Sequence, residues 1–227
     1  MGKNKIARFE ENKKLPNVIQ PTREEALSNF NLKGKWRKEF FKNENPIVLE
    51  LGCGKGEYTV GMAKAFPDKN FIGVDIKGAR FWFGAKEAIE NNLQNVAFLR
   101  TQIELIDCFF AENEVDEIWI TFPDPQIKYR RGKHRLTHPD FLERYKKITK
   151  PEAVVHLKTD SEFLHGYTLG ILQGFGHDIL TAHHDIYGAP EYEPDTLYLR
   201  EIKTYYEELF SAKGKTITYI KFRIKSK

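Results

Sequence analysis

The chain of 227 residues is 41% hydrophobic and 13% aromatic, which is enough apolar material for one domain with a substantial core. It has only two cysteines and no apolar run approaching about 18 residues, which argues against a disulfide scaffold and a membrane-spanning protein. The formal net charge is +4, and the basic excess lies near the start, where residues 1–46 hold 11 Lys or Arg against 6 Asp or Glu.

We expect residues 1–45 to form a basic N-terminal arm and residues 46–227 to form a single domain. A lysine-rich arm on a nearly neutral body suits polyphosphate, although solvated surface lysine is the commoner explanation of such charge. The first five residues lack the apolar stretch of a signal peptide, so secretion is not expected. The sequence therefore predicts a cytoplasmic protein with reduced cysteines.

Strands and helices alternate along most of the remaining chain. Helices are predicted at residues 57–66, 79–91, 103–110, 139–147 and 161–173. Strands are predicted at residues 47–51, 70–75, 96–100, 117–121, 153–158, 178–183 and 217–224. Because crossover helices join most strands, this seven-stranded α/β sheet should be mostly parallel and covered by helices on both faces. The long connection before the last strand would allow one antiparallel edge.

The first strand runs directly into three glycines, Gly52, Gly54 and Gly56, with an acidic residue, Glu50, just before them. Glycine lets the backbone adopt positive φ and lets a ligand approach main-chain N–H groups, so this turn is a candidate cofactor loop. A dinucleotide fingerprint needs two residues between its second and third glycines, but only Lys55 stands there. The spacing instead resembles the first motif of S-adenosylmethionine-dependent methyltransferases. The alternative is an ordinary tight turn of an α/β protein.

Polar residues follow three further strands, at the sheet edge where ligands bind in such folds. Asp75 ends the second strand and could accept hydrogen bonds from both hydroxyls of a ribose, although strand-ending Asp is also a common turn residue. Gln102 follows the third strand, and its amide could read an adenine edge. Asp124 follows the fourth strand between two prolines, which present the acid rigidly; a stiff turn with a solvated Asp is the alternative.

Residues 128–135 form a strongly basic stretch, Lys-Tyr-Arg-Arg-Gly-Lys-His-Arg, with five Lys or Arg and no acid. Basic clusters are usually solvated surface, but this one lies beside the proposed cofactor loop, and arginine forks suit phosphate groups. The sequence therefore predicts RNA or DNA as the substrate. The fifth strand ends in another polar cluster, Lys158, Thr159 and Asp160, at the same edge of the sheet.

After about residue 45 the chain resembles the bacterial tRNA (guanine-N7)-methyltransferases, which make 7-methylguanosine at the variable-loop guanosine of tRNA. The resemblance is carried by Glu-Leu-Gly-Cys-Gly-Lys-Gly at 50–56, Phe-Pro-Asp-Pro at 122–125 with the basic stretch, Lys-Thr-Asp at 158–160 and Thr-Tyr-Tyr-Glu at 204–207. The chain departs from the family at Gln126, where Trp is usual, and at Gln102, where Asp is frequent. The first change removes an aromatic ring, and the second removes a charge but keeps a hydrogen-bond acceptor.

The resemblance implies a Rossmann-like methyltransferase fold and a role for each motif. S-adenosylmethionine, the cofactor, would be held by Glu50, Gly52, Gly54, Gly56, Asp75, Gln102 and Asp124. The target guanosine would be contacted by Lys128, Asp160, Thr204, Tyr206 and Glu207, and the tRNA backbone by Arg130, Arg131, Lys133 and Arg135. Catalysis would fall to Asp124 and Asp160, with Glu207 as a further candidate, because a carboxylate can offset the positive charge that grows on the methylated guanine.

Two other classes of protein are compatible with parts of this pattern. A methyltransferase acting on a small molecule or a protein would keep the glycine loop but has no obvious use for the basic stretch. A non-catalytic RNA-binding protein could lose the acids, yet all of them are present. A nicotinamide oxidoreductase is disfavoured by the glycine spacing. No metal is expected, since the histidines and cysteines show no metal-ligand pattern, and a monomer or a homodimer remains open.

Overall fold

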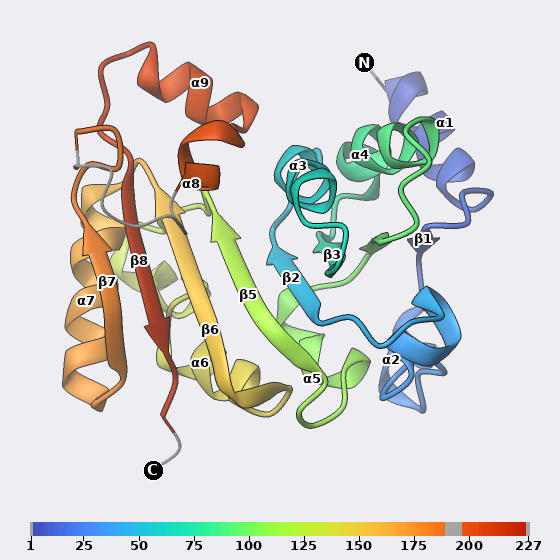
Figure 1. Cartoon of the computed structure of the whole chain (residues 1–227), viewed down its shortest axis with the longest axis horizontal. Helices are drawn as coiled ribbons and strands as arrows, with labels where there is room; N and C mark the ends of the chain where they lie inside the picture. Colours follow the sequence, from blue (N-terminus) through green and yellow to red (C-terminus); the bar gives the residue numbers. More distant parts are fainter. Residues whose placement is uncertain (1, 189–196, 226–227) are drawn as a thin grey trace.

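The computed structural model describes residues 2–188 and 197–225, which build one eight-stranded sheet with helices on both faces (Figure 1). The sheet has the order β1-β4-β3-β2-β5-β6-β8-β7. Its strands are β1 (Val18–Ile19), β2 (Ile47–Leu51), β3 (Asn70–Val74), β4 (Val96–Leu99), β5 (Val115–Thr121), β6 (Thr149–Thr159), β7 (Asp178–His183) and β8 (Thr218–Arg223).

The prediction of a mostly parallel sheet is confirmed. The strands from β1 to β6 pair in parallel, with Leu49 of β2 opposite Ile72 of β3 and Ile118 of β5. Strand β8 runs antiparallel to both of its neighbours, β6 and β7. The expectation of an antiparallel edge was therefore wrong in one respect, because the antiparallel strand is inserted inside the sheet and β7 forms the edge.

The predicted number of seven strands was also wrong, because the N-terminal region adds β1. The main chain of this two-residue strand bonds to β4, through Phe98 N to Asn17 O at 2.8 Å and Arg100 N to Ile19 O at 2.8 Å. A strand of two residues is too short to show the alternation from which strands are predicted. Its place in the sheet is fixed by tertiary contacts rather than by local pattern.

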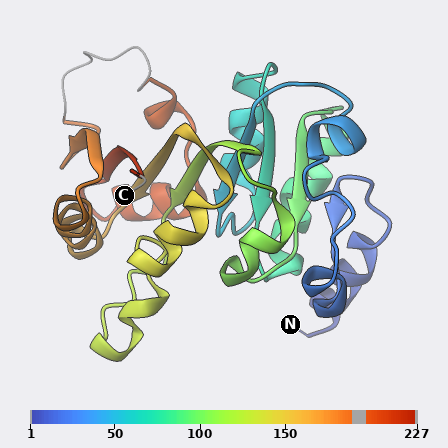
Figure 2. The same ribbon diagram turned by 90° about the horizontal axis from the view of Figure 1, so that it is seen from below.

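Two hydrophobic clusters lie on opposite faces of the sheet. Figure 2 shows the sheet and its covering helices from below. The alternation along β2 divides its side chains, with Leu49 on one face and Val48 on the other. The face with Val48 is covered by α3 (Glu57–Ala65), α4 (Gly78–Glu90) and α8 (Leu197–Glu201). The face with Leu49 is covered by α5 (Ile106–Phe109), α6 (Pro139–Lys146) and α7 (Glu162–Phe175).

The remaining helical elements belong to the N-terminal region and to the pocket described below. They are α1 (Gly2–Asn12), α2 (Arg23–Leu27), the π-helical η1 (Trp36–Phe41), the 3₁₀ turns η2 (Ile103–Leu105) and η3 (Tyr129–His134), and α9 (Tyr205–Ser211). Among the described residues no helix is long and apolar enough to cross a membrane.

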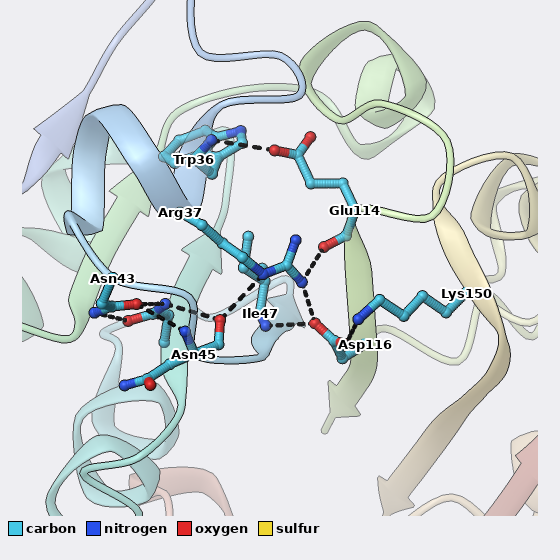
Figure 3. Close-up of polar contacts among 9 residues, drawn as sticks. Trp36, Arg37, Asn43, Asn45, Ile47, Glu114, Asp116 and Lys150 are labelled. Atoms are coloured by element: carbon cyan, nitrogen blue, oxygen red, sulfur yellow. Dashed lines mark hydrogen bonds and ion pairs between the residues drawn. The ribbon is translucent and has the colours of Figure 1, made fainter.

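The segment expected to be a basic arm is packed into the domain. The fully buried ring of Trp36 stacks on Phe110 with centroids 5.4 Å apart, and its indole N–H donates to Phe109 O at 2.9 Å. Figure 3 shows Arg37 reaching from η1 to Asp116, which also accepts from Ile47 N. This part of the segment is therefore pinned to the start of β2 and β5, at the end of the sheet opposite the glycine loop.

Helix α1 lies against α4, and the contact continues into β1 (Figure 1). The amide of Asn12 is fully buried and donates to Gly78 O at 2.9 Å, where α4 begins. The amide of Asn17 donates to Ala85 O at 3.0 Å, in the middle of α4. These bonds explain why a lysine-rich segment can still be ordered, since Asn12 and Asn17 satisfy buried carbonyls while the lysines from Lys5 to Lys42 stay at the surface.

Candidate active site

The turn after β2 uses its glycines for two different purposes. All three have positive φ, with values of 81° at Gly52, 58° at Gly54 and 82° at Gly56. A Cβ atom on Gly56 would lie 2.6 Å from the ring of Phe98, so this glycine permits close packing of the loop on the sheet. A Cβ on Gly54 would meet nothing within 4 Å, so this glycine keeps the main chain open toward a ligand.

Glu50 is a buried acid at the end of β2. Its carboxylate accepts hydrogen bonds from the hydroxyls of Thr59, on α3, and Thr121, at the end of β5. Burial raises the pKa of Glu50 to about 7, although both threonine hydrogen bonds act in the opposite direction. The group is therefore poised between neutral and charged at physiological pH, and it becomes a better anion when a cation binds beside it.

Asp75 follows β3 and organises the glycine loop. One carboxylate oxygen accepts from Gly54 N at 3.1 Å and the other from Lys77 N at 2.8 Å. These two bonds leave further lone pairs on the carboxylate for a ligand. Asp75 thus joins the ends of β2 and β3 around the same site.

The Pro-Asp-Pro turn after β5 has an unusual backbone. Phe122 and Gln126, on either side of it, both have φ of 46°, a left-handed conformation that non-glycine residues rarely adopt. Within the turn, Asp124 accepts from Gln126 N at 3.2 Å and is otherwise exposed. The turn therefore presents this carboxylate from a constrained loop.

These elements surround one pocket of about 490 Å³, a volume suited to a ligand of cofactor size. Of the residues predicted from the sequence, its wall contains Glu50, Gly52, Gly54, Asp75, Gln102, Asp124, Arg131, Thr204 and Tyr206. The structure therefore brings together residues from the ends of four strands and from α9, more than 150 positions apart in the chain. Gly56 lies outside the wall, in the packing role described above.

Three predicted contacts lie on a projecting basic surface rather than in the pocket. Lys128, Arg130 and Lys133 are exposed, as is Arg131, which also reaches the pocket wall. Figure 2 shows the yellow-green segment that contains η3 projecting away from the sheet. We define these four side chains, Lys128, Arg130, Arg131 and Lys133, as the η3 cations.

Arg135, which the resemblance assigned to the tRNA backbone, differs in position from its basic neighbours. Its guanidinium is buried, donates to the carbonyls of Pro125 and Gln126 at 3.3 and 3.0 Å, and lies 4.4 Å from the ring centroid of Tyr167. Because the guanidinium fork is already bound to main-chain carbonyls and packed on a ring, it is not presented to a phosphate. Arg135 instead holds the base of the projecting segment against α7.

Glu207, which the resemblance assigned to the guanosine, is buried and bound to other side chains of the protein. Its carboxylate is fully buried, forms an ion pair with Lys158 at 2.8 Å, and accepts from the hydroxyl of Tyr187 at 2.7 Å. It lies outside the pocket wall, whereas Thr204, which caps α9 by accepting from Glu207 N at 3.1 Å, is part of that wall. The motif at 204–207 therefore divides into pocket residues and a buried anchor.

Asp160 also lies outside the pocket wall. Its carboxylate is mostly buried and pairs with the ammonium of Lys215 at 2.6 Å, and that ammonium in turn lies 4.6 Å from the ring centroid of Phe210. One carboxylate oxygen of Asp160 is thus already engaged by a lysine.

Some pocket residues were not predicted from the sequence. Ile76, directly after Asp75, is a partly exposed apolar side chain in the wall. Tyr205 donates from its main-chain N to Glu57 at 3.0 Å, and Lys55 lies 4.2 Å from its ring centroid. The position of Ile76 after the strand-end acid was the available signal for that residue. Tyr205 itself belongs to the 204–207 segment that the resemblance assigned to the guanosine, and only its contacts with Glu57 and Lys55 depend on tertiary structure alone.

Within the described ranges no group of three or more His, Cys, Asp or Glu side chains is arranged to hold a metal ion. Cys53, inside the glycine loop, is buried, and burial raises the pKa of its thiol well above the ordinary value. It is therefore a packed thiol rather than a thiolate ligand.

Known proteins with a similar fold indicate the general class of this protein. The solved structure of the 16S rRNA methyltransferase KamB is similar with a TM-score of 0.62 at 15% identity, over 85% of this chain and 92% of that chain. An antibiotic-related methyltransferase is similar with a TM-score of 0.59 at 18% identity, over 82% and 90%. A family described as putative methyltransferase matches residues 44–220. The solved structures thus show a Rossmann-like methyltransferase fold, and the family model assigns residues 44–220 to the methyltransferases.

Proteins with similar sequences identify the family within that class. Proteins named tRNA (guanine-N(7)-)-methyltransferase are 66% identical in Christiangramia forsetii, over 99% of both chains, and 51% identical in Bacteroides fragilis, over 98% of this chain and 86% of the relative. A third, from Cytophaga hutchinsonii, is 40% identical over 98% of both. The chain belongs to the tRNA (guanine-N(7)-)-methyltransferase family, as the resemblance found in its sequence implied.

Proposed function

We propose that the protein transfers the methyl group of S-adenosylmethionine to N7 of the variable-loop guanosine, position 46, of tRNA, giving 7-methylguanosine. The observation that carries this proposal is one shared pocket whose wall includes the glycine loop, three strand-end polar side chains and the exposed part of the 204–207 motif. Family membership supports the same chemistry. Since tRNA is a cytoplasmic substrate, we propose that the reaction takes place in the cytoplasm.

The residues of the pocket suit this cofactor. S-adenosylmethionine supplies an electrophilic methyl group on a positively charged sulfonium, and Glu50, Asp75 and Asp124 line the pocket with carboxylates. Asp75 keeps acceptor capacity for the ribose hydroxyls beyond its two main-chain bonds. Gln102 offers a donor and an acceptor to the adenine edge, and the open side of Gly54 lets the main chain approach.

The chemistry requires positioning more than proton transfer. Guanine N7 carries an in-plane lone pair and no proton, so no residue has to act as a general base. Holding the nucleophile and the methyl group in line contributes roughly 7–11 kcal/mol in well-oriented reactions. The guanine becomes cationic as the new bond forms, and a carboxylate that accepts from its N1–H and amino group lowers the barrier.

Asp124 and Asp160 are the carboxylates that we propose for this role. Asp124 is exposed and lies in the pocket wall, so it can meet the base without rearrangement. Asp160 would first exchange the ammonium of Lys215 for the base. The η3 cations would bind phosphates of the tRNA beside the pocket, because they project from the same edge of the sheet and have no carboxylate partner among the ion pairs of the described residues. For Lys128 this replaces the guanosine contact that the resemblance implied, because Lys128 lies outside the pocket wall.

The test is nucleoside analysis of tRNA incubated with the protein and S-adenosylmethionine, in which we expect 7-methylguanosine to form. Borohydride reduction and aniline cleavage of a single tRNA transcript then locate the modified base. A transcript with adenosine in place of guanosine 46 is the matched control and should stay intact. Methylation at another position would contradict the assigned target, and methylation of free nucleosides but not of tRNA would indicate a small-molecule methyltransferase.

A further inference from the structure

Lys158 is a fully buried lysine at the end of β6 that has no part in the pocket wall. Its ammonium forms three contacts with one segment of the chain: it donates to the carbonyl of Leu199 on α8, donates to the carbonyl of Ile202 at 3.3 Å, and pairs with the carboxylate of Glu207 on α9 at 2.8 Å. A single side chain of the sheet therefore ties together α8, α9 and the link between them.

Glu207, the carboxylate partner of the Lys158 ammonium, has a second hydrogen-bond partner. The hydroxyl of Tyr187 donates to Glu207 at 2.7 Å, and the ring centroid of Tyr58, on α3, lies 5.3 Å from the Lys158 ammonium. Burial lowers the pKa of Lys158 to about 8, while Glu207 acts in the opposite direction, so the lysine is charged at neutral pH. The pair thus fixes the segment by charge as well as by hydrogen bonds.

The segment that Lys158 fixes forms one wall of the pocket. Thr204, Tyr205 and Tyr206 stand between the carbonyl of Ile202 and the carboxylate of Glu207, and all three line the pocket. Figure 1 shows α8 and α9 above the ends of β5 and β6. Any shift of the anchor points would move these three residues relative to Asp124, which lines the same pocket.

A buried ion pair is a poor way to gain stability, because removing two charges from water costs about as much as their attraction returns. Apolar side chains of similar volume would fill the same space without that cost. The hydrogen bonds from Lys158 to two main-chain carbonyls have a different effect, because they define one position for the α8–α9 segment. Its geometry is therefore better explained by placement of the pocket wall than by stability.

We propose that Lys158 is a positioning residue for methyl transfer: through Leu199, Ile202 and Glu207 it holds residues 204–206 where the target guanine must lie. This inference rests on the proposed function. This role differs from that of the residues proposed to bind the cofactor, which line the pocket, and from that of the η3 cations, which are exposed.

The test compares the wild type with Lys158→Met/Glu207→Gln, which removes both charges, and with Glu207→Gln, which keeps the two carbonyl contacts of Lys158 and the acceptor for Tyr187. We expect single-turnover methyl transfer to tRNA, measured well below the melting temperature, to fall about 100-fold in the double variant and about 10-fold in the single variant. A displacement near 1 Å is sufficient for losses of this size. Affinities for S-adenosylhomocysteine and tRNA should stay within threefold of the wild type.

The matched control is Lys69→Met, which breaks the Lys69–Glu117 ion pair of 2.9 Å on the same sheet, away from the pocket. It should lower the melting temperature without changing the rate of methyl transfer. If Lys158→Met/Glu207→Gln and Glu207→Gln both transferred the methyl group at the wild-type rate, the positioning role of Lys158 would be overturned and the proposed function would stand. A rate loss matched by an equal loss of S-adenosylhomocysteine binding would also overturn it, and a wild type unable to methylate tRNA would overturn the proposed function together with it.

Discussion

The carboxylate of Glu50 accepts a hydrogen bond from the hydroxyl of Thr59 across the interface between β2 and α3. Burial raises the pKa of this carboxyl from 4.5 to about 7, so the folded protein holds its proton more tightly than the unfolded chain does. The stabilisation that follows is fully present below about pH 4.5 and is lost as the pH rises through 7. The folded state of the ligand-free protein is therefore more stable when the Glu50 carboxyl is neutral than when it is charged.

We expect Glu50→Gln to raise the unfolding free energy of the ligand-free protein at pH 7.5 relative to the wild type, and to change it little at pH 4.5. The expected difference between the two pH values is about 3 kcal/mol, from a pKa raised by between two and three units. Denaturant unfolding at both pH values measures it. Parallel pH profiles of the two proteins would contradict the assignment.

Asp75 should contribute equally to binding of S-adenosylmethionine and S-adenosylhomocysteine, because its proposed partners are the ribose hydroxyls common to both. Asp75→Ala removes hydrogen bonds to a charged group and should weaken each ligand by about 1.5–3 kcal/mol, or roughly 10-fold to 150-fold. Titration calorimetry measures both affinities. Asp75→Asn, which keeps one acceptor for Gly54 N, should lose less. Saturable NADH binding with no response to S-adenosylhomocysteine would indicate another class of enzyme.

The η3 cations should give tRNA binding its dependence on salt. Alanine at Lys128, Arg130, Arg131 and Lys133 together should flatten the slope of log K against log salt by about 3, since each lost phosphate contact removes roughly 0.7–0.9. Filter binding over a range of salt concentrations measures the slope, and binding of S-adenosylhomocysteine should survive. An unchanged slope would show that the tRNA phosphates lie on another surface.

Arg135 should behave differently from its basic neighbours. Because its guanidinium is bound to the carbonyls of Pro125 and Gln126, Arg135→Ala should lower the unfolding free energy by about 1.5–3 kcal/mol and leave the salt slope of tRNA binding nearly unchanged. Thermal unfolding and the same filter assay separate the two effects. A loss of salt slope without a loss of stability would restore Arg135 as a phosphate contact.

Local pattern was sufficient to predict the seven long strands, the glycine loop and the acids at the strand ends, because alternation, glycine spacing and strand-end position are written within a few neighbouring residues. It was insufficient for Arg135 and Glu207. A charged residue is expected at the surface unless its partner is known, and their partners are carbonyls at 125 and 126 and a lysine at 158. The same limit applies to the N-terminal segment, where Asn12 and Trp36 are buried by residues far along the chain.

The insertion of β8 between β6 and β7 has a consequence for synthesis on the ribosome. Until residues 218–223 emerge, β6 and β7 have no strand between them, and each exposes unpaired main-chain groups that invite pairing with another chain. The α8–α9 segment comes just before β8 in the chain, so the pocket wall and the strand that closes the sheet are translated together. A nascent chain thus gains its full binding site only when its most aggregation-prone edges are covered.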